Sequence, residues 1–188
     1  LEVEGFPSLG QCADRILAMR GRDTGAAVIA INAEKVVSCR NDAVLRGVIA
    51  QADVRYPDGA AIVLAMRCKG VRSGRVTGAD LWLEVLRRAG PAAIPVALLG
   101  GAPEVANETA RRLVAEFPYV SVCLLRDGYS GMQDEEAVLN DLHSSRPEFV
   151  FVAMGSPRQE FLIGRLRQRY PAAIYMGLGG SFDVYSGR

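Results

Sequence analysis

Histidine is the scarcest of the chemically useful residues in this sequence. His143 is the only one among 188 residues, so a histidine-based metal site or nucleophilic triad would have to rest on it, and both kinds of site are disfavoured. Lysine is also rare, because the 22 basic residues are all arginines except Lys35 and Lys69. Arginine suits carboxylate and phosphate ligands, but genome base composition can produce the same bias. The bias alone therefore assigns no ligand.

The four cysteines contain no C-x-x-C pair; they are Cys12, Cys39, Cys68 and Cys123. This spacing excludes a zinc ribbon and a disulfide framework. We expect all four to be small, reduced core residues of a cytosolic protein.

Long apolar runs are missing as well. No stretch reaches the roughly 18 apolar residues that indicate a membrane-spanning helix, and the first ten residues lack the basic and apolar regions of an export signal. We therefore expect that the chain neither spans a membrane nor carries such a signal. Because it begins at Leu1 without a methionine and stops at Arg188 in a polar run, we expect it to be cut from a longer protein.

The composition is that of a globular protein. Hydrophobic residues make up 49% and charged residues 23% of the chain, which excludes disorder, collagen and a coiled coil. The net charge of +1 supplies no overall field for binding nucleic acid or a membrane. The length fits one domain or two small lobes.

Apolar runs alternate with amphipathic stretches along the chain, which is typical of β-α units. The predicted strands are 26–31, 53–56, 94–99, 120–125, 149–154 and 173–178, and the predicted helices are 8–20, 41–52, 60–68, 78–89, 103–117, 134–143 and 158–169. We predict an α/β fold: a Rossmann-like, largely parallel sheet with flanking helices, as two closely packed lobes in a single domain of residues 1–188. Residues 1–91 would form the acceptor-binding and catalytic half and residues 92–188 a doubly wound, ligand-binding half.

The predicted helix 60–68 is largely apolar, so we expect it to be buried. The same apolar residues fit a subunit interface of a homo-oligomer equally well. Trp82 is expected in the core rather than under a sugar. His143 is expected at a helix end, and the acids of residues 134–136 in the first turn of a helix rather than at a metal.

Glycine follows most of the predicted strands. The segments are Gly100-Gly101, Arg126-Asp127-Gly128-Tyr129, Gly155-Ser156-Pro157-Arg158-Gln159 and Gly179-Gly180-Ser181-Phe182-Asp183. Ligands of parallel sheets bind at these carboxyl ends, and glycine lets backbone N–H groups approach an anion. A phosphorylated or nucleotide ligand is therefore expected. Neither G-x-G-x-x-G nor G-x-x-x-x-G-K-[ST] occurs, which disfavours an NAD-dependent oxidoreductase and a P-loop enzyme.

Asp58 is the first candidate for catalysis. It follows a predicted strand and precedes an apolar helix, where partial loss of water would raise its pKa and make it a general base. Pro57-Asp58-Gly59 is equally a common turn, and an aspartate there can simply cap the next helix.

Basic residues gather in the loop after this helix: Arg67, Lys69, Arg72 and Arg75. Guanidinium groups on such a loop suit a diphosphate, although a solvated surface loop is an equal alternative. Gln159 starts a later helix, where its amide could bind a sugar or base. Alternatively Ser156 caps that helix, with Pro157 first and Gln159 and Glu160 forming a capping box.

Several segments in a fixed order resemble one family. They are Asn32-Ala33-Glu34-Lys35, Pro57-Asp58-Gly59, Arg75-Val76-Thr77-Gly78-Ala79-Asp80-Leu81, Leu98-Leu99-Gly100-Gly101, Asp127-Gly128-Tyr129, Gly155-Ser156-Pro157-Arg158-Gln159-Glu160 and Gly179-Gly180-Ser181-Phe182-Asp183. Over residues 5–188 the chain resembles the WecG/TagA/CpsF bacterial glycosyltransferases, also called glycosyltransferase family 26.

The resemblance implies inverting transfer of a sugar, with a β-1,4 link, from a UDP-sugar to a polyprenyl-diphosphate-linked GlcNAc-type acceptor on the cytoplasmic membrane face. The sugar it implies is N-acetylmannosamine or its uronic acid. No metal or other cofactor is implied. The roles it implies are Asp58 as the base, Asn32 orienting the sugars, Arg75 and Arg72 holding the diphosphate, Gln159 contacting the donor, and Tyr129 and Asp183 holding the uridine. Gly101, Gly155 and Ser156 would line the donor site.

The chain departs from the family pattern at two places. Ala30 stands where the family often has threonine, so a glucosyltransferase of exopolysaccharide synthesis remains an alternative function. A non-catalytic UDP-binding module is a further alternative. Relatives usually continue with a basic, aromatic-rich membrane-docking appendage, and the chain ends at Arg188 where it would begin. No nucleic-acid partner is expected.

Overall fold

The strands form one sheet. The computed structural model describes all residues, 1–188, and its six strands are ordered β2-β1-β6-β5-β3-β4 with every neighbouring pair parallel. The strands are β1 (Ala26–Ile31), β2 (Val54–Pro57), β3 (Ile94–Gly100), β4 (Val120–Arg126), β5 (Phe149–Ala153) and β6 (Ile174–Gly177). The predicted α/β fold is confirmed, and the sheet is wholly parallel.

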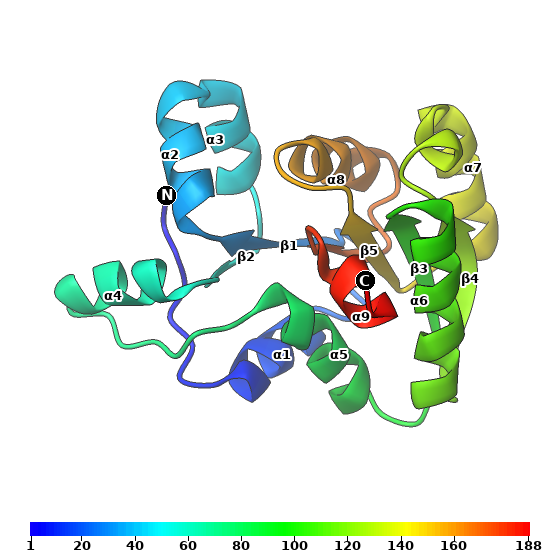
Figure 1. The fold of residues 1–188 in the computed structure, drawn as a ribbon, viewed down its shortest axis with the longest axis horizontal. Coiled ribbons are helices and arrows are strands. Elements are labelled where there is room, and N and C mark those ends of the chain that lie inside the picture. Colours follow the sequence, from blue (N-terminus) through cyan, green and yellow to red (C-terminus); the bar gives the residue numbers. More distant parts are fainter.

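Helices cover both faces of the sheet (Figure 1). One face carries α1 (Leu9–Leu17), α5 (Gly78–Arg88), α6 (Pro103–Glu116) and α9 (Ser181–Ser186). The other carries α2 (Ala33–Asn41), α3 (Ala43–Ala50), α7 (Glu135–Ser145) and α8 (Arg158–Arg169). Neighbouring strand residues divide between the two cores, since Val28 faces the first and Ile29 the second, as the alternation of side chains along a strand requires.

The two predicted halves share this sheet. Strand β1 pairs with β2 from its own half and with β6 from the other, placing Ala26 beside Ile174. The core is therefore continuous across the chain.

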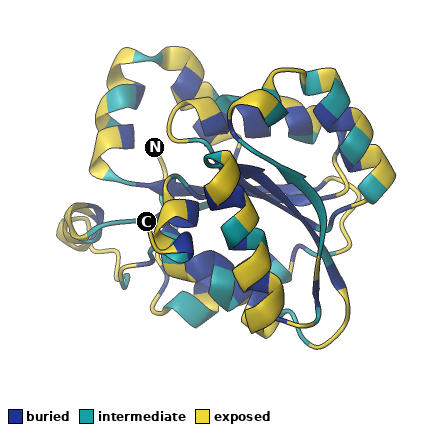
Figure 2. Ribbon diagram, turned by 45° about the vertical axis from the view of Figure 1, so that its right-hand side comes forward, coloured by how far each residue is buried: buried dark blue, intermediate teal, exposed yellow.

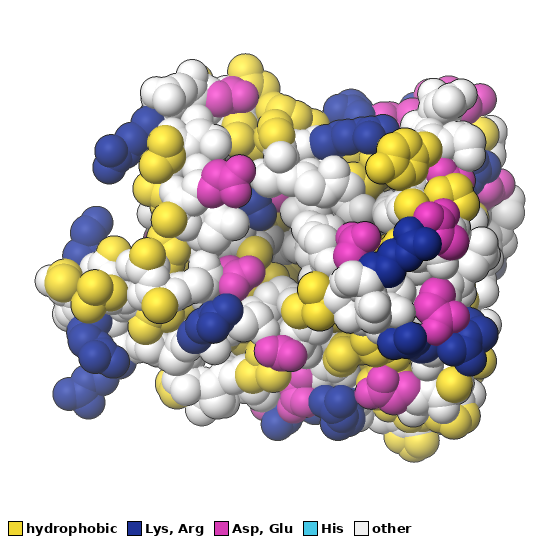
Figure 3. Space-filling model, viewed as in Figure 1, with side chains coloured by type: hydrophobic (Ala, Val, Ile, Leu, Met, Phe, Trp, Pro, Cys, Tyr) yellow, Lys and Arg dark blue, Asp and Glu magenta, His cyan; other side chains and the backbone are white.

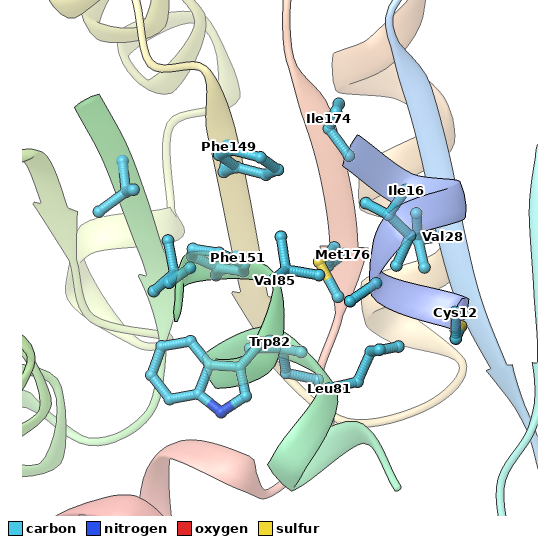
Figure 4. Packing of buried hydrophobic residues seen from close by; sticks show 14 of the residues in the cluster. Cys12, Ile16, Val28, Leu81, Trp82, Val85, Phe149, Phe151, Ile174 and Met176 are labelled. Carbon is cyan, nitrogen blue, oxygen red and sulfur yellow. The ribbon is translucent and has the colours of Figure 1, made fainter. Parts of the chain in front are cut away.

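Trp82 on α5 belongs to the larger core cluster (Figure 4). Its side chain is fully buried, and its ring centroid lies 5.3 Å from that of Phe151 and 5.1 Å from that of Tyr185, both in edge-on geometry. Such pairs contribute about 0.5–1.5 kcal/mol beyond the area they bury. The prediction that Trp82 is a core residue is confirmed.

Helix α2 was not predicted. Its inward residues include Lys35 and Cys39, so no apolar period marks it in the sequence. The helix is held at its start by Asn32, whose Oδ1 accepts a hydrogen bond from the Lys35 backbone N–H at 2.9 Å. An N-cap of this kind stabilises a helix by about 1 kcal/mol.

The prediction that helix α4 (Ala60–Cys68) is buried is wrong. Only Ile62 and Met66 are buried in it, neither belongs to a core cluster, and Leu64 is 62% exposed. The helix projects from the sheet in Figure 1, and exposed residues dominate it in Figure 2. Cys68 is exposed too, so the expectation that all cysteines are core residues is wrong. None of the helices has the length and apolar character to cross a membrane.

Candidate active site at the carboxyl ends of the strands

A cavity of about 450 Å³ opens where β1, β2 and β6 end, on the face shown in Figure 3. Five residues singled out from the sequence line it together: Asn32, Asp58, Arg75, Ser156 and Gln159. They come from segments up to 127 positions apart in the chain. The parallel sheet gathers them, since all its strands present their carboxyl ends at one edge.

Asp58 is held at the cavity by a tight turn after β2. Its backbone N–H donates to the Ile31 carbonyl oxygen at 2.9 Å, and Gly59 has φ +106°, which a side chain would strain. Helix α4 begins at Gly59 without a side-chain cap. The alternative that Asp58 caps this helix is therefore excluded.

The charge state of Asp58 is tuned by its surroundings. Partial burial raises the pKa of the carboxyl group above its usual value, while the Gly78 backbone N–H and the positive charges of Arg75 and Lys35 oppose the rise. A carboxylate with a raised pKa is a stronger base, and it still ionises near neutrality when cations lie close.

Two further charged residues, not predicted as site residues, belong to this site: Lys35 lines the cavity and Glu160 pairs with it from behind the wall. Lys35 and Glu160 are 5% and 0% exposed, and Lys35 Nζ lies 2.9 Å from Glu160 Oε1. Lys35 Nζ also donates to the Ala30 carbonyl oxygen at 3.0 Å. Both residues stand in the family-like segments, but nothing in those segments shows that the chain folds them into contact.

Gln159 extends this network to the next loop. Its Nε2 donates to Glu160 Oε1 at 2.9 Å, and its Oε1 accepts from the Gly179 backbone N–H at 2.9 Å. The network thus ties the ends of β1, β5 and β6 together. The capping-box alternative is wrong, because α8 starts after Pro157 without a side-chain cap and Gln159 is buried.

The wall beside Asp58 is unusually close-packed. A Cβ atom on Gly78 would lie 3.0 Å from the Tyr56 hydroxyl and 3.9 Å from Asp58 Oδ2. The Tyr56 hydroxyl is buried without a hydrogen-bond partner, and burial raises its pKa well above the usual value. Tyr56 therefore stays neutral and can donate a hydrogen bond towards the carboxylate side of the cavity.

The starts of five helices present backbone N–H groups at this edge of the sheet, and that of Gly78 at the start of α5 already binds Asp58. Helices α4, α5, α6, α8 and α9 all begin without a side-chain cap. Uncapped helix starts attract anions through their unpaired N–H groups and the helix dipole. The edge therefore suits a phosphorylated ligand.

The chain reverses its direction of winding at β3 and β5. Helix α6, which follows β3, packs on one face, whereas α8, which follows β5, packs on the other. Ligands of open α/β sheets commonly bind at such a switch. Gly101 and Gly155 lie in the two loops with φ of +72° and +71°; a Cβ atom would meet nothing within 4 Å at Gly155, whereas the Gly101 backbone N–H is already bonded to the Ala153 carbonyl oxygen.

Five predicted site residues do not line the cavity; they are Arg72, Gly101, Tyr129, Gly155 and Asp183. Tyr129 is 68% exposed beyond β4, where its backbone N–H donates to Asp127 Oδ1 at 2.8 Å. Asp183 is exposed in the first turn of α9, and Arg72 is exposed in the loop after α4. Their roles stay predictions.

Other hollows offer less chemistry. The one bordered by Arg20, His143 and Glu148 has about 740 Å³, but its carboxylate Glu148 is already paired with Arg20. No three His, Cys, Asp or Glu side chains converge as metal ligands would, and metal independence stays a prediction. The free carboxylate and guanidinium at the 450 Å³ cavity are the better candidates for catalysis.

A family comparison agrees with this geometry. The model of the glycosyl transferase WecG/TagA/CpsF family matches residues 5–188, which is nearly the whole chain and includes every residue of the cavity. The chain therefore belongs to the WecG/TagA/CpsF glycosyltransferases of cell-surface polysaccharide synthesis.

Proposed function

We propose that the protein moves a hexose-type sugar from a UDP-sugar to a polyprenyl-diphosphate-linked acceptor with inversion at the anomeric carbon. The observation that carries the proposal is the pairing of Asp58, a half-buried carboxyl group with a raised pKa, with Arg75, a guanidinium group without an acidic partner, in one cavity. Single-displacement transfer needs these two functions, a base and a positive charge.

In the proposed reaction Asp58 takes the proton of the acceptor hydroxyl. The hydroxyl oxygen then forms a bond to the anomeric carbon from the face opposite UDP, and the bond from that carbon to the UDP oxygen breaks. UDP departs with the electron pair as an anion, and Arg75 offsets its developing charge. Asn32 lines the same cavity and would orient the sugars.

The donor would lie across the carboxyl ends of β3 and β5, where the direction of winding changes. The glycines of these loops and the uncapped starts of α6 and α8 support a diphosphate at this place. We propose Gln159, Gly101, Gly155 and Ser156 around the donor, with Arg72 reaching its phosphates. Tyr129 and Asp183 would hold the uridine, with the donor extending from the cavity across the sheet edge.

The finer substrate assignment follows the family resemblance. We propose N-acetylmannosamine or its uronic acid as the donor sugar, a GlcNAc-type acceptor and a β-1,4 link, without a metal ion, at the inner face of the bacterial cytoplasmic membrane. Ala30 lines the cavity and leaves a methyl group where a hydroxyl would bind a sugar. Because Ala30 lacks that hydroxyl, we propose glucose as the alternative donor sugar.

Transfer of radiolabelled sugar from UDP-sugars to a lipid-diphosphate-GlcNAc acceptor tests the proposal, with the complete protein. Asp58→Asn should lower the rate about 10²–10⁴-fold, as loss of a general base does, while calorimetry finds UDP binding nearly unchanged. Asp23→Asn, at an exposed carboxylate of a turn, is the matched control. UDP binding without any transfer by the unsubstituted protein would instead favour a non-catalytic nucleotide-binding module.

A further inference from the structure

Glu160 is a buried carboxylate directly behind the active-site cavity. Its side chain is 0% exposed and does not line this cavity, whereas its neighbour Gln159 and its ionic partner Lys35 both do. Glu160 Oε1 accepts a hydrogen bond from Gln159 Nε2 and lies 2.9 Å from Lys35 Nζ, so one oxygen atom serves both residues. Glu160 is therefore out of reach of a substrate, but it contacts two residues that a substrate can touch.

Stability of the fold alone explains this carboxylate poorly. Apolar side chains of similar volume can often replace a buried ion pair without loss of stability. Glu160 Oε2 is also buried without a hydrogen-bond partner, although the large majority of buried polar atoms in folded proteins have one. A buried ion pair with an unsatisfied oxygen atom is thus a costly way to stabilise a fold.

On one side, Glu160 orients the amide group of Gln159. Because Gln159 Nε2 donates to Glu160, its Oε1 faces the other way and accepts from the Gly179 backbone N–H at 2.9 Å. Gln159 also packs closely on the end of β6, since a Cβ atom on Gly177 would lie 3.0 Å from Nε2. The loop after β6 is therefore held by a side chain that Glu160 itself holds.

This loop forms the part of the cavity wall next to Asp58. Ser181 stands two positions after Gly179. A Cβ atom on Gly78 would lie 3.9 Å from Ser181 Oγ and 3.9 Å from Asp58 Oδ2, so the loop and the carboxylate approach Gly78 together. A displacement of the loop would change the space around the Asp58 carboxylate.

On the other side, Glu160 holds Lys35 against the end of β1. Lys35 Nζ donates to the Ala30 carbonyl oxygen at 3.0 Å. The next carbonyl oxygen of this strand, that of Ile31, accepts from the Asp58 backbone N–H at 2.9 Å. The second part of the wall beside Asp58 is therefore linked to Glu160 as well.

We propose that Glu160 is a positioning residue of the transfer reaction: through Gln159 and Lys35 it fixes the loop after β6 and the end of β1, the two walls beside the base. The effect on rate rests on the proposed function, whereas the hydrogen bonds themselves can be tested without activity. A displacement of about 1 Å at a reacting group can lower a rate about 10²-fold. Loss of the Glu160 acceptor should therefore lower kcat and leave UDP binding nearly unchanged.

Two double variants separate the hydrogen bond to Gln159 from the ion pair. Lys35→Met/Glu160→Gln and Lys35→Met/Glu160→Met both remove the two buried charges, so neither leaves one ion unpaired. They differ only in that the glutamine offers an amide oxygen to Gln159 Nε2 and the methionine offers none. Lys35→Met/Glu160→Leu is a second variant without an acceptor, for use if the methionine variant does not fold.

Amide hydrogen exchange at Gly179, followed by NMR without any substrate, tests the network. Exchange should be roughly fivefold faster in the methionine variant than in the glutamine variant, which is the effect of one neutral hydrogen bond. Gly101 is the matched control, because its backbone N–H donates to the Ala153 carbonyl oxygen at 3.0 Å in the loop after β3 and should exchange equally in both variants. Equal exchange of Gly179 in the two variants would overturn the proposal.

Transfer kinetics test what the network does. At a temperature at which both variants are folded, kcat of the methionine variant should lie about 10–100-fold below that of the glutamine variant, with similar UDP binding by calorimetry. A purely structural role would lower the melting temperature and leave kcat of the folded protein unchanged. Equal kcat values would therefore contradict a positioning role.

Failure of this inference differs from failure of the proposed function. If the complete, unsubstituted protein transfers no sugar, the proposed function fails, whatever the exchange of Gly179 shows. If that protein transfers sugar while the two variants exchange and turn over equally, Glu160 is not a positioning residue and the proposed function stands.

Discussion

The two lysines lie in opposite environments at neighbouring parts of the molecule. Lys35 lies under the active-site cavity, 5% exposed and 2.9 Å from Glu160. Lys69 lies at the end of α4, exposed and without an acidic partner. Burying a charge costs free energy that only a partner and hydrogen bonds offset, whereas an exposed charge stays solvated. Lys35 is thus paired inside the chain, although Glu160 Oε2 is buried without a hydrogen-bond partner, whereas the charge of Lys69 stays solvated at the end of α4.

Replacement of either lysine by methionine should give the largest contrast. Lys35→Met leaves the Glu160 carboxylate buried without its cation, so the free energy of unfolding should fall by about 3–5 kcal/mol. Lys69→Met should change it by less than about 0.5 kcal/mol, because the side chain is exposed. Urea unfolding followed by circular dichroism measures both.

A second substitution distinguishes the ion pair from simple packing. Lys35→Met/Glu160→Gln removes both charges, and it should recover part of the stability lost in the single variant. If the stability losses of the two single substitutions simply add in the double variant, the ion pair itself contributes no stability. The difference between Lys35 and Lys69 would then result from burial alone.

The pH dependence of sugar transfer should be determined by charged residues of the cavity and not by residues of α4. Burial raises the pKa of Asp58, and the base must be ionised, so the rate should rise about tenfold per pH unit below that pKa and level off above it. The midpoint should lie above the usual value for aspartate, about 3.9. Arg75→Gln removes a charge that lowers this pKa and should move the midpoint to higher pH, whereas Leu64→Glu should leave it in place.

The same shift has a consequence for stability. Because the folded-state pKa of Asp58 is raised, ionisation of this group stabilises the unfolded state relative to the folded state as pH increases. Its contribution to stability is fully present below the unfolded-state pKa and is lost as pH rises through the folded-state value. Asp58→Asn should therefore be at least as stable as the unsubstituted protein at pH 7, and a lower melting temperature for this variant would contradict the assigned environment.

The smallest effect on stability is expected at Leu64, on the exposed side of α4. Leu64 is 62% exposed and belongs to no core cluster, so Leu64→Ala should change the free energy of unfolding by less than about 0.5 kcal/mol. Leu86 on the next helix is fully buried, and Leu86→Ala should cost about 2–5 kcal/mol. Comparable losses in thermal melts would mean that α4 is packed in solution.

Local signals predicted most elements and the outline of the site. The run of residues 26–31 became β1, Ser8 caps α1 through the Gln11 backbone N–H, and Asp134 caps α7. Asp58 was selected because it follows a predicted strand and precedes an apolar helix, and Arg75 because basic residues cluster in the loop after that helix; both line the cavity. Patterns of this kind act over a few residues, so they can be read along the chain.

Partners far apart in the chain could not be read in this way. Lys35 and Glu160 are separated by 125 positions, and only the packing of α2 and α8 on the same face of the sheet brings them together. Helix α2 was missed because its inward face includes this lysine. Tyr56 gave no signal either, since its unpartnered hydroxyl depends on the approach of Gly78.

The sequence by itself determined the alternation of strands and helices, the turn after β2 that carries Asp58 and the loop after α4 that carries Arg75. Only the tertiary structure decided which apolar residues are covered. Apolar composition shows that α4 gains free energy when it leaves water, but not whether the fold supplies a surface for it. The sheet ends at β2 and only Ile62 and Met66 of that helix are buried, so its other apolar residues face outward.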